Sequence, residues 1–127
     1  MKITEEVQML LARADHAIEV ARVLEEKGYH ADAASKTYYA MFYSAQALLK
    51  AEGVDVVKHS AVESALGYHF AKTGRLNPEF HRMLLNSRKI RETADYDLHE
   101  EIIEPVARVE IKNGVSFVAE MKRLISI

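Results

Sequence analysis

Apolar and small residues occupy almost every side of the stretch 35–50, SKTYYAMFYSAQALLK. At about 100° per residue, the helix that it predicts has one face of large apolar side chains and a second face of small ones, where another helix could approach closely. Tyr39 and Tyr43 lie on a third side. Polar residues keep only a narrow strip, around Lys36, Gln46 and Lys50. We therefore expect a core helix from about residue 31 to 53, enclosed by other helices of this chain or of a partner.

Helical periodicity continues in three further long stretches. Thr4 is a good N-cap and Gly28 a good stop, which predicts a helix over about 4–27. Asn77 followed by Pro78 opens another helix. The last helix runs to about Ser126 and tolerates Pro105 only in its first turn. Its glycine, Gly114, interrupts an apolar stripe and indicates close backbone packing at that point.

A short helix is predicted between the second and third long ones. Ser60 and Glu63 have capping-box spacing, and the apolar positions that follow end before Gly74. No strand-like alternation or internal repeat interrupts the helical pattern. The predicted fold is all-α: an antiparallel up-and-down four-helix bundle with one additional short helix, in a single domain over residues 1–127.

The composition of the chain argues against several classes of location and binding site. The chain has 127 residues, five Gly, two Pro, no Cys and a formal net charge of −2. We expect no signal peptide, no membrane segment and a cytoplasmic location. Global charge gives no drive toward nucleic acid, so binding of that kind needs a local basic patch. The six histidines show no metal-ligand spacing, and we expect no metal and no cofactor. His59 is interpreted as a helix-entry residue rather than as a base.

Arg91 is the most informative charged residue. It falls on the apolar face of the helix that begins at Pro78, a face that we expect to include Phe80, Leu84, Ala94 and Leu98. A guanidinium there must be paired or must line a groove, because burying it alone costs too much free energy. Asp95 is one turn away and can pair with it, and Lys36 is a second candidate partner for Asp95. One interpretation is that these charges form a structural polar cluster that fixes helix register. The more specific interpretation is that they form a binding site for an anion or a phosphate group.

Two further patterns bear on nucleic-acid binding. The tyrosines Tyr38, Tyr39 and Tyr43 could stack on bases, but in so apolar a helix we expect them to belong to the core or to a dimer surface. The best local basic patch consists of Arg82, Arg88, Lys89 and Arg91. Glu92 and Asp95 interrupt it, so its direct signal for nucleic acid is modest.

The segments ASKTYYAMFYSAQALL and RETADYD, separated by KHSAVESAL and KTG, together resemble a small stand-alone prokaryotic HEPN domain. The resemblance covers nearly the whole chain. It implies an up-and-down helical bundle that is commonly a homodimer and is often encoded beside a minimal nucleotidyltransferase, as a toxin–antitoxin pair. In the catalytic branch of the family, an Arg followed four to six residues later by His forms a metal-independent RNase site at the dimer interface.

Carried over residue by residue, the resemblance places Arg91 at the motif arginine and Tyr96 where an R-x4-H histidine would stand. An RNase needs a group that exchanges a proton near neutral pH, which imidazole does well. An ordinary tyrosine titrates far too high, and a paired Asp95 is a poor general acid. Arg75 and His81 also have motif spacing, but Asn77 and Pro78 separate them at a loop-to-helix junction.

Three functional hypotheses follow. The first is a homodimeric partner of a nucleotidyltransferase, with Arg91, Asp95 and Tyr96 as its site and Tyr96 as an accessible residue open to nucleotide transfer. In this hypothesis Arg91, Arg88 and Lys36 bind the phosphate of a nucleotide or RNA. The second is an atypical metal-independent RNase in which another group replaces the histidine. The third is a non-catalytic bundle in which the same charges only fix helix register.

Overall fold

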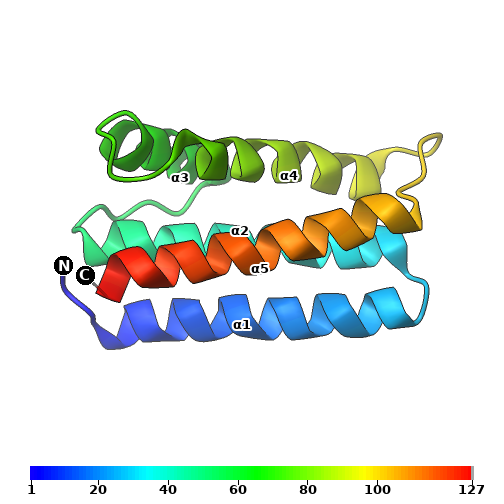
Figure 1. Cartoon of the computed structure of the whole chain (residues 1–127), viewed down its shortest axis with the longest axis horizontal. Coiled ribbons are helices and arrows are strands. Elements are labelled where there is room, and N and C mark those ends of the chain that lie inside the picture. Colours follow the sequence, from blue (N-terminus) through cyan, green and yellow to red (C-terminus); the bar gives the residue numbers. More distant parts are fainter. Residues whose placement is uncertain (127) are drawn as a thin grey trace.

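Four long helices and one short one make up the fold. The computed structural model describes residues 1–126. The long helices are α1 (Glu5–Glu26), α2 (His30–Ala51), α4 (Pro78–Tyr96) and α5 (Glu104–Ser126). The short helix α3 (His59–Leu66) continues into a π-helical turn, η1 (Gly67–Ala71). Successive long helices run in opposite directions (Figure 1). The predicted all-α bundle with one additional short helix is therefore confirmed.

Two predicted helix starts are confirmed by capping contacts. Thr4 Oγ1 accepts a hydrogen bond from the Val7 N–H at 3.2 Å, and Asn77 Oδ1 accepts one from the Glu79 N–H at 3.0 Å. Pro105 is the second residue of α5, where its missing N–H is not needed. The predicted capping box at Ser60 is wrong. The short helix already begins at His59, its N-cap residue Lys58 makes no side-chain cap, and Glu63 turns inward instead.

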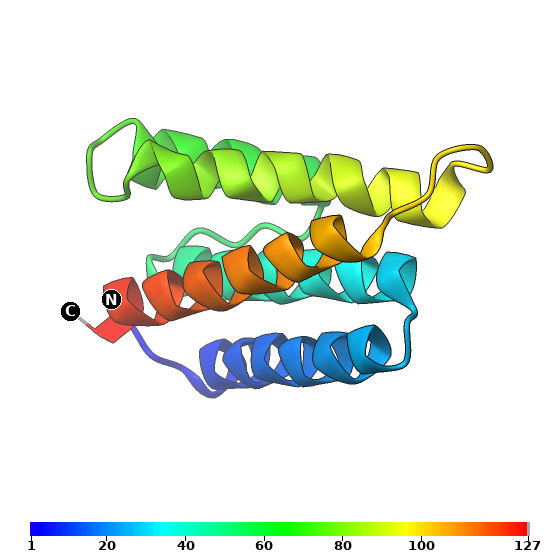
Figure 2. The ribbon, with the colours of Figure 1, turned by 45° about the vertical axis from the view of Figure 1, so that its right-hand side comes forward.

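Helix α2 lies at the centre of the molecule. It packs against α1, α5, α4 and α3, as expected for a core helix (Figure 2). Within residues 1–126, α1 and α4 flank α2 and do not contact each other. Since α5 covers only one side between them, α2 keeps one strip of its surface uncovered. Five residues of α2 that are exposed or half-buried form this α2 strip: Lys36, Tyr39, Tyr43, Gln46 and Lys50.

Helices α2 and α5 approach each other closely at a glycine, as the sequence predicted. A Cβ atom added to Gly114 would lie 2.5 Å from Thr37 Cγ2 and 3.3 Å from Ile18 Cδ1. Thr37 cannot easily move away, because it is fully buried and its hydroxyl donates a 2.8 Å hydrogen bond to the Ala33 carbonyl. Any larger residue at position 114 would therefore push α5 away from α2 and α1.

Helix α4 is held less firmly than the other long helices. Its only fully buried residues are Leu84 and Ser87. Ser87 Oγ donates a 2.8 Å hydrogen bond to Glu110 Oε2 and so ties α4 to α5. Burial raises the pKa of the Glu110 carboxyl, and the hydrogen bond from Ser87 offsets part of that rise. A single buried polar contact therefore takes the place of an extensive apolar interface here.

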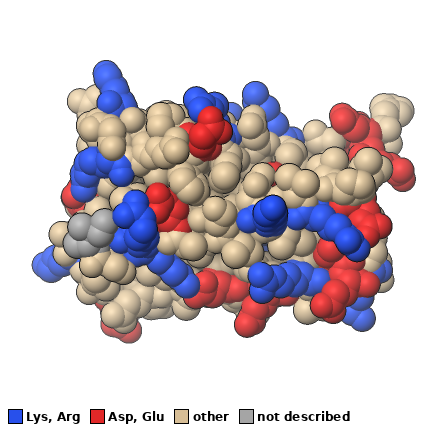
Figure 3. Space-filling view, viewed as in Figure 1, with Lys and Arg blue, Asp and Glu red and all other residues tan. Residues whose placement is uncertain are grey.

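The face that carries α5 and α1 shows acidic and basic side chains side by side (Figure 3). Surface charge of both signs gives this face no overall attraction for anions. None of the helices within residues 1–126 combines the length and the apolar composition that crossing a membrane would require.

Replacing Gly114 by alanine should destabilise the fold in spite of the better helix propensity of alanine. The new methyl group overpacks the contact with Thr37, and we expect a net loss of about 1–2 kcal/mol in the free energy of unfolding. Chemical denaturation measures this loss. The combined variant Gly114→Ala/Thr37→Ser removes the clashing Cγ2 and should lose less than the sum of the two single changes. Strict additivity would show that the two side chains do not meet.

Candidate functional site

Arg91 lies in a ring of tyrosines where α4 crosses α2. Its side chain is only 11% exposed. The guanidinium carbon is 5.4 Å from the ring centroid of Tyr38, 5.9 Å from that of Tyr39 and 5.8 Å from that of Tyr96. Aromatic faces attract cations, so three rings stabilise the charge without neutralising it. The buried Nε atom of Arg91 has no hydrogen-bond partner.

Asp95 is the carboxylate beside Arg91. Its Oδ2 lies 3.7 Å from Arg91 Nη1, one helical turn along α4, which is the predicted pair. The same oxygen accepts a 3.2 Å hydrogen bond from Ser35 Oγ on α2. The contact with Arg91 is long for a hydrogen bond and involves one nitrogen only. Arg91 therefore keeps hydrogen-bond donors that the chain does not use.

Tyr96 ends α4 and is 73% exposed, so its ring is accessible as predicted. One edge of the cluster thus reaches solvent while Arg91 remains sheltered. Leu98 was expected to continue the apolar face of this helix, and that expectation is wrong. The helix stops at Tyr96, and Leu98 lies in the following loop with 94% of its surface exposed.

His59 joins the site from a direction that sequence reasoning missed. It is the first residue of α3, which agrees with its interpretation as a helix-entry residue. Its ring also stacks on Phe42 at 4.4 Å, and its Nδ1 is hydrogen-bonded to the Tyr38 hydroxyl at 2.6 Å. Burial, followed by the positive charges of Arg91 and Arg88, lowers the pKa of His59 below its usual value. The imidazole is therefore neutral at pH 7.

Burial acts on Tyr38 in the opposite direction. It raises the pKa of the Tyr38 hydroxyl far above the usual value, and the charge of Glu63 adds to the rise. Tyr38 therefore keeps its proton at any ordinary pH. Since both partners are neutral, the Tyr38–His59 pair presents a neutral hydrogen-bonded unit beside the Arg91 cation.

A second ion pair lies behind this cluster. Arg88 Nε is 2.9 Å from Glu63 Oε1, and the Glu63 side chain is only 7% exposed. Burial raises the pKa of Glu63, while the attraction of Arg88 offsets part of the rise. Arg88 was predicted to bind phosphate, but its charge is already directed at this buried carboxylate. The sequence signal for Glu63 was its place between the buried residues Val62 and Leu66, where a charged side chain needs a partner.

The prediction that Lys36 is a second partner of Asp95 is wrong, because the α2 residue that faces Asp95 is Ser35. One residue along a helix is a rotation of about 100°, which carries Lys36 to the other flank of α2. There it lines a shallow groove against α1, together with Arg13, His16 and Tyr43. The structure thus brings together Arg91, Asp95 and Tyr96, and it adds His59 and Tyr38.

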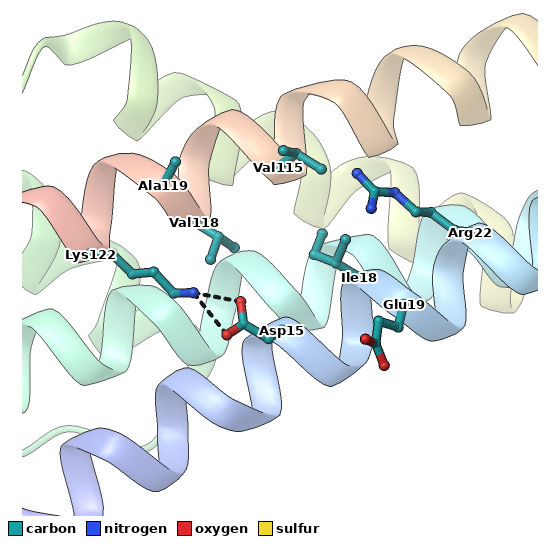
Figure 4. A pocket seen from close by; sticks show the side chains of 8 residues that line it. All are labelled: Asp15, Ile18, Glu19, Arg22, Val115, Val118, Ala119 and Lys122. Atoms are coloured by element: carbon teal, nitrogen blue, oxygen red, sulfur yellow. Dashed lines mark hydrogen bonds and ion pairs between the residues drawn. The ribbon is translucent and has the colours of Figure 1, made fainter.

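The groove between α1 and α5 is a separate feature (Figure 4). Its apolar floor includes Ile18 and Val118, and Lys122 Nζ pairs with both carboxylate oxygens of Asp15 at 2.7 and 2.8 Å. It shares no residue with the Arg91 cluster, and its carboxylates offset its cations. Within the part of the chain that the structure describes, no three His, Cys, Asp or Glu side chains are placed to hold a metal ion.

The pKa of His59 should report its distance from Arg91. In the wild type we expect the His59 ring to titrate below pH 6.5, measured by NMR of its ring protons. Arg91→Gln removes a positive neighbour and should raise this pKa, yet burial is the larger cause and should keep it below the normal value. The matched change Arg22→Gln, on the opposite flank of the bundle, should leave it unchanged. An identical titration in the Arg91 and Arg22 variants would contradict the arrangement described here.

Comparison with known proteins shows the family to which the chain belongs. The family model of the HEPN domain matches residues 7–126. A UPF0332 protein of Gloeobacter violaceus is 38% identical over 94 residues, which cover 74% of this chain and 75% of the relative. A Methanocaldococcus jannaschii protein named "Putative toxin MJ0605" is 31% identical over 95% of this chain and 90% of its own length. A UPF0332 protein of Thermotoga maritima is 32% identical over 89% and 86%. This chain belongs to the HEPN domain family.

Proposed function

We propose that this chain is the HEPN-domain component of a toxin–antitoxin-like module, in which a homodimer acts with a minimal nucleotidyltransferase. Arg91 engages a phosphate group of a nucleotide or of RNA. The family match supports this proposal, as does the archaeal relative whose name includes the word toxin. The cytoplasm, where nucleotides and RNA are available, is the compartment in which we expect the module to act.

The observation that carries the proposal is the incomplete pairing of Arg91. A guanidinium with 11% exposure has lost most of its hydration, and its one carboxylate neighbour is 3.7 Å away. Guanidinium groups bind phosphate oxygens through paired N–H donors, and such charge-assisted bonds strengthen where water is excluded. A phosphate arriving past Tyr96 and Tyr39 would satisfy donors that the protein leaves free. A purely structural role would instead place a close, well-aligned carboxylate on this group.

Tyr96 is the acceptor in the proposed reaction with the nucleotidyltransferase. Its hydroxyl oxygen attacks the α-phosphorus of a nucleoside triphosphate, a new P–O bond forms, and pyrophosphate leaves with the broken bond. The tyrosine proton passes to a base of the transferase. Its 73% exposure at the end of α4 leaves the ring accessible to a second protein, and Arg91 is close enough to hold the transferred phosphate.

This reaction can be tested by intact-mass measurement. The chain, incubated with ATP, Mg²⁺ and a minimal nucleotidyltransferase encoded beside it, should gain one nucleoside monophosphate. Tyr96→Phe should abolish the gain, and Arg91→Gln should slow it by at least about tenfold. Tyr68→Phe is the matched control, because Tyr68 is 65% exposed and lies on η1. Modification that persists in Tyr96→Phe, or a gene neighbourhood without such a transferase, would contradict the proposal.

His59 favours a second candidate function, a metal-independent endoribonuclease. The family histidine is replaced by Tyr96, but the structure supplies a neutral imidazole beside the same tyrosine ring that Arg91 contacts. In this reaction the RNA 2′-oxygen attacks the phosphorus and gives its proton to His59. Arg91 stabilises the additional negative charge, and the bond from phosphorus to the 5′-oxygen of the next nucleotide breaks as His59 gives the proton it took up to that oxygen.

RNA cleavage in the presence of EDTA distinguishes this candidate. His59→Gln and Arg91→Ala should each lower the rate by about 100-fold or more, while Tyr96→Phe should have little effect. His69→Gln is the matched control for the loss of an imidazole, since His69 lies on η1. Equal background cleavage in the wild type and in Arg91→Ala would dismiss the ribonuclease. Thermal melting of each variant checks that the fold survives.

A further inference from the structure

Two aromatic rings of the α2 strip lie in a row between two cations from the neighbouring helices. Arg91 lies 5.9 Å from the ring centroid of Tyr39, and the ring centroids of Tyr39 and Tyr43 are 6.2 Å apart. Arg13 on α1 lies 5.8 Å from the ring centroid of Tyr43. The two arginines reach α2 from opposite flanks, since α4 and α1 lie on different sides of it (Figure 1). Both central tyrosines are half-buried, so part of each ring is available to a ligand.

The middle of this row carries positive charge that no carboxylate of the adjoining groove offsets. The groove between α1 and α2 is lined by Arg13, His16 and Lys36 with Tyr43 and apolar residues, and no carboxylate lines it. Within residues 1–126, neither Arg13 nor Lys36 forms an ion pair. The groove between α1 and α5 differs, because Asp15 and Glu19 lie among its lining residues. This groove is therefore complementary to an anion in a way that the α1–α5 groove is not. At the two ends of the strip carboxylates are present, because Asp95 lies beside Arg91 and Lys50 pairs with Glu6 and Asp55.

The spacing of the row indicates a polymer. A mononucleotide offers one base to stack, whereas this row presents two rings between two separate cations. Base stacking on aromatic side chains, beside a basic groove that follows the backbone, is the common mode of binding single-stranded nucleic acid. Paired bases in a duplex keep their faces covered and cannot use such rings.

We propose that the α2 strip is a binding track for single-stranded RNA. Phosphates lie along Arg91, Lys36 and Arg13, and unpaired bases rest on Tyr39 and Tyr43. The track rests on the proposed function in one respect, because Arg91 is its phosphate contact at one end. It extends that site across α2 to a residue of α1.

Fluorescence anisotropy with a labelled single-stranded oligoribonucleotide of about 12 nucleotides tests the track. The double variant Arg13→Ala/Lys36→Ala should bind at least about tenfold more weakly at low salt. Its salt dependence should become shallower by about 1.4, the slope expected for two lost phosphate contacts. The control Arg22→Ala/Lys112→Ala removes the same charge from exposed positions outside the strip and should bind as the wild type does. Duplex RNA should bind more weakly than the single strand, because its base faces are covered.

The stacking contact is tested separately. Tyr43→Leu keeps apolar packing and should weaken binding by at least about fivefold, whereas Tyr43→Phe keeps the ring and should not. Unchanged RNA affinity in the Arg13/Lys36 variant would overturn the track while leaving the phosphate site at Arg91 intact, provided that Arg91→Gln still weakens binding. A changed oligomeric mass with unchanged RNA affinity would also overturn it, by making the strip a subunit interface. Absence of RNA binding in the wild type overturns the track alone if nucleotide transfer to Tyr96 still occurs.

Discussion

Burial of α2 on every side but one is the constraint from which the other features follow. Small residues on two of its sides, such as Thr37 and Ala40, let α5 and α1 approach closely. The large rings are therefore left to the side that meets α3 and α4, where Tyr38 and Phe42 pack against His59. Aromatic surface with polar edges is the environment that can hold a guanidinium, and Arg91 occupies it. The uneven distribution of large and small side chains around α2 thus determines where the charge of Arg91 lies.

The positive charge of Arg91 changes the protonation equilibrium of the neighbouring His59. Aromatic faces stabilise Arg91 without cancelling its field, which therefore still acts on His59 and helps to keep the imidazole neutral. An anion bound at Arg91 would reduce this effect and make protonation of His59 easier. Ligand binding and the proton affinity of a nearby base are thus coupled through a short distance. This coupling requires no movement of the backbone.

Much of the fold followed from local signals. Caps at Thr4 and Asn77, the stop at Gly28 and the close packing at Gly114 all depend on residues near in sequence or on the lack of a side chain. Arg91 and Asp95 were predicted as a pair because one helical turn separates them. The exposure of Tyr96 followed from its angular position on the same helix. These features needed no knowledge of which helices meet.

The remainder of the site depends on contacts between distant segments. His59 and Tyr38 are 21 residues apart, and Arg88 and Glu63 are 25 apart, so helical periodicity could not pair them. Glu63 fits a capping box and a buried ion pair equally well until α4 is placed beside it. Lys36 and Ser35 differ by one position, and only the angle at which α4 crosses α2 decides which of them meets Asp95. Local pattern identifies candidates, while the tertiary arrangement selects among them.

The weak attachment of α4 has a consequence for how the molecule opens. With two fully buried residues and one buried hydrogen bond to α5, α4 can separate locally while α1, α2 and α5 stay packed. Arg91 lies on the seam between α4 and α2. Any molecule that binds to both sides of this seam adds its binding free energy to the docking of α4. A bound molecule would then slow amide hydrogen exchange throughout α4, including at residues that it does not touch.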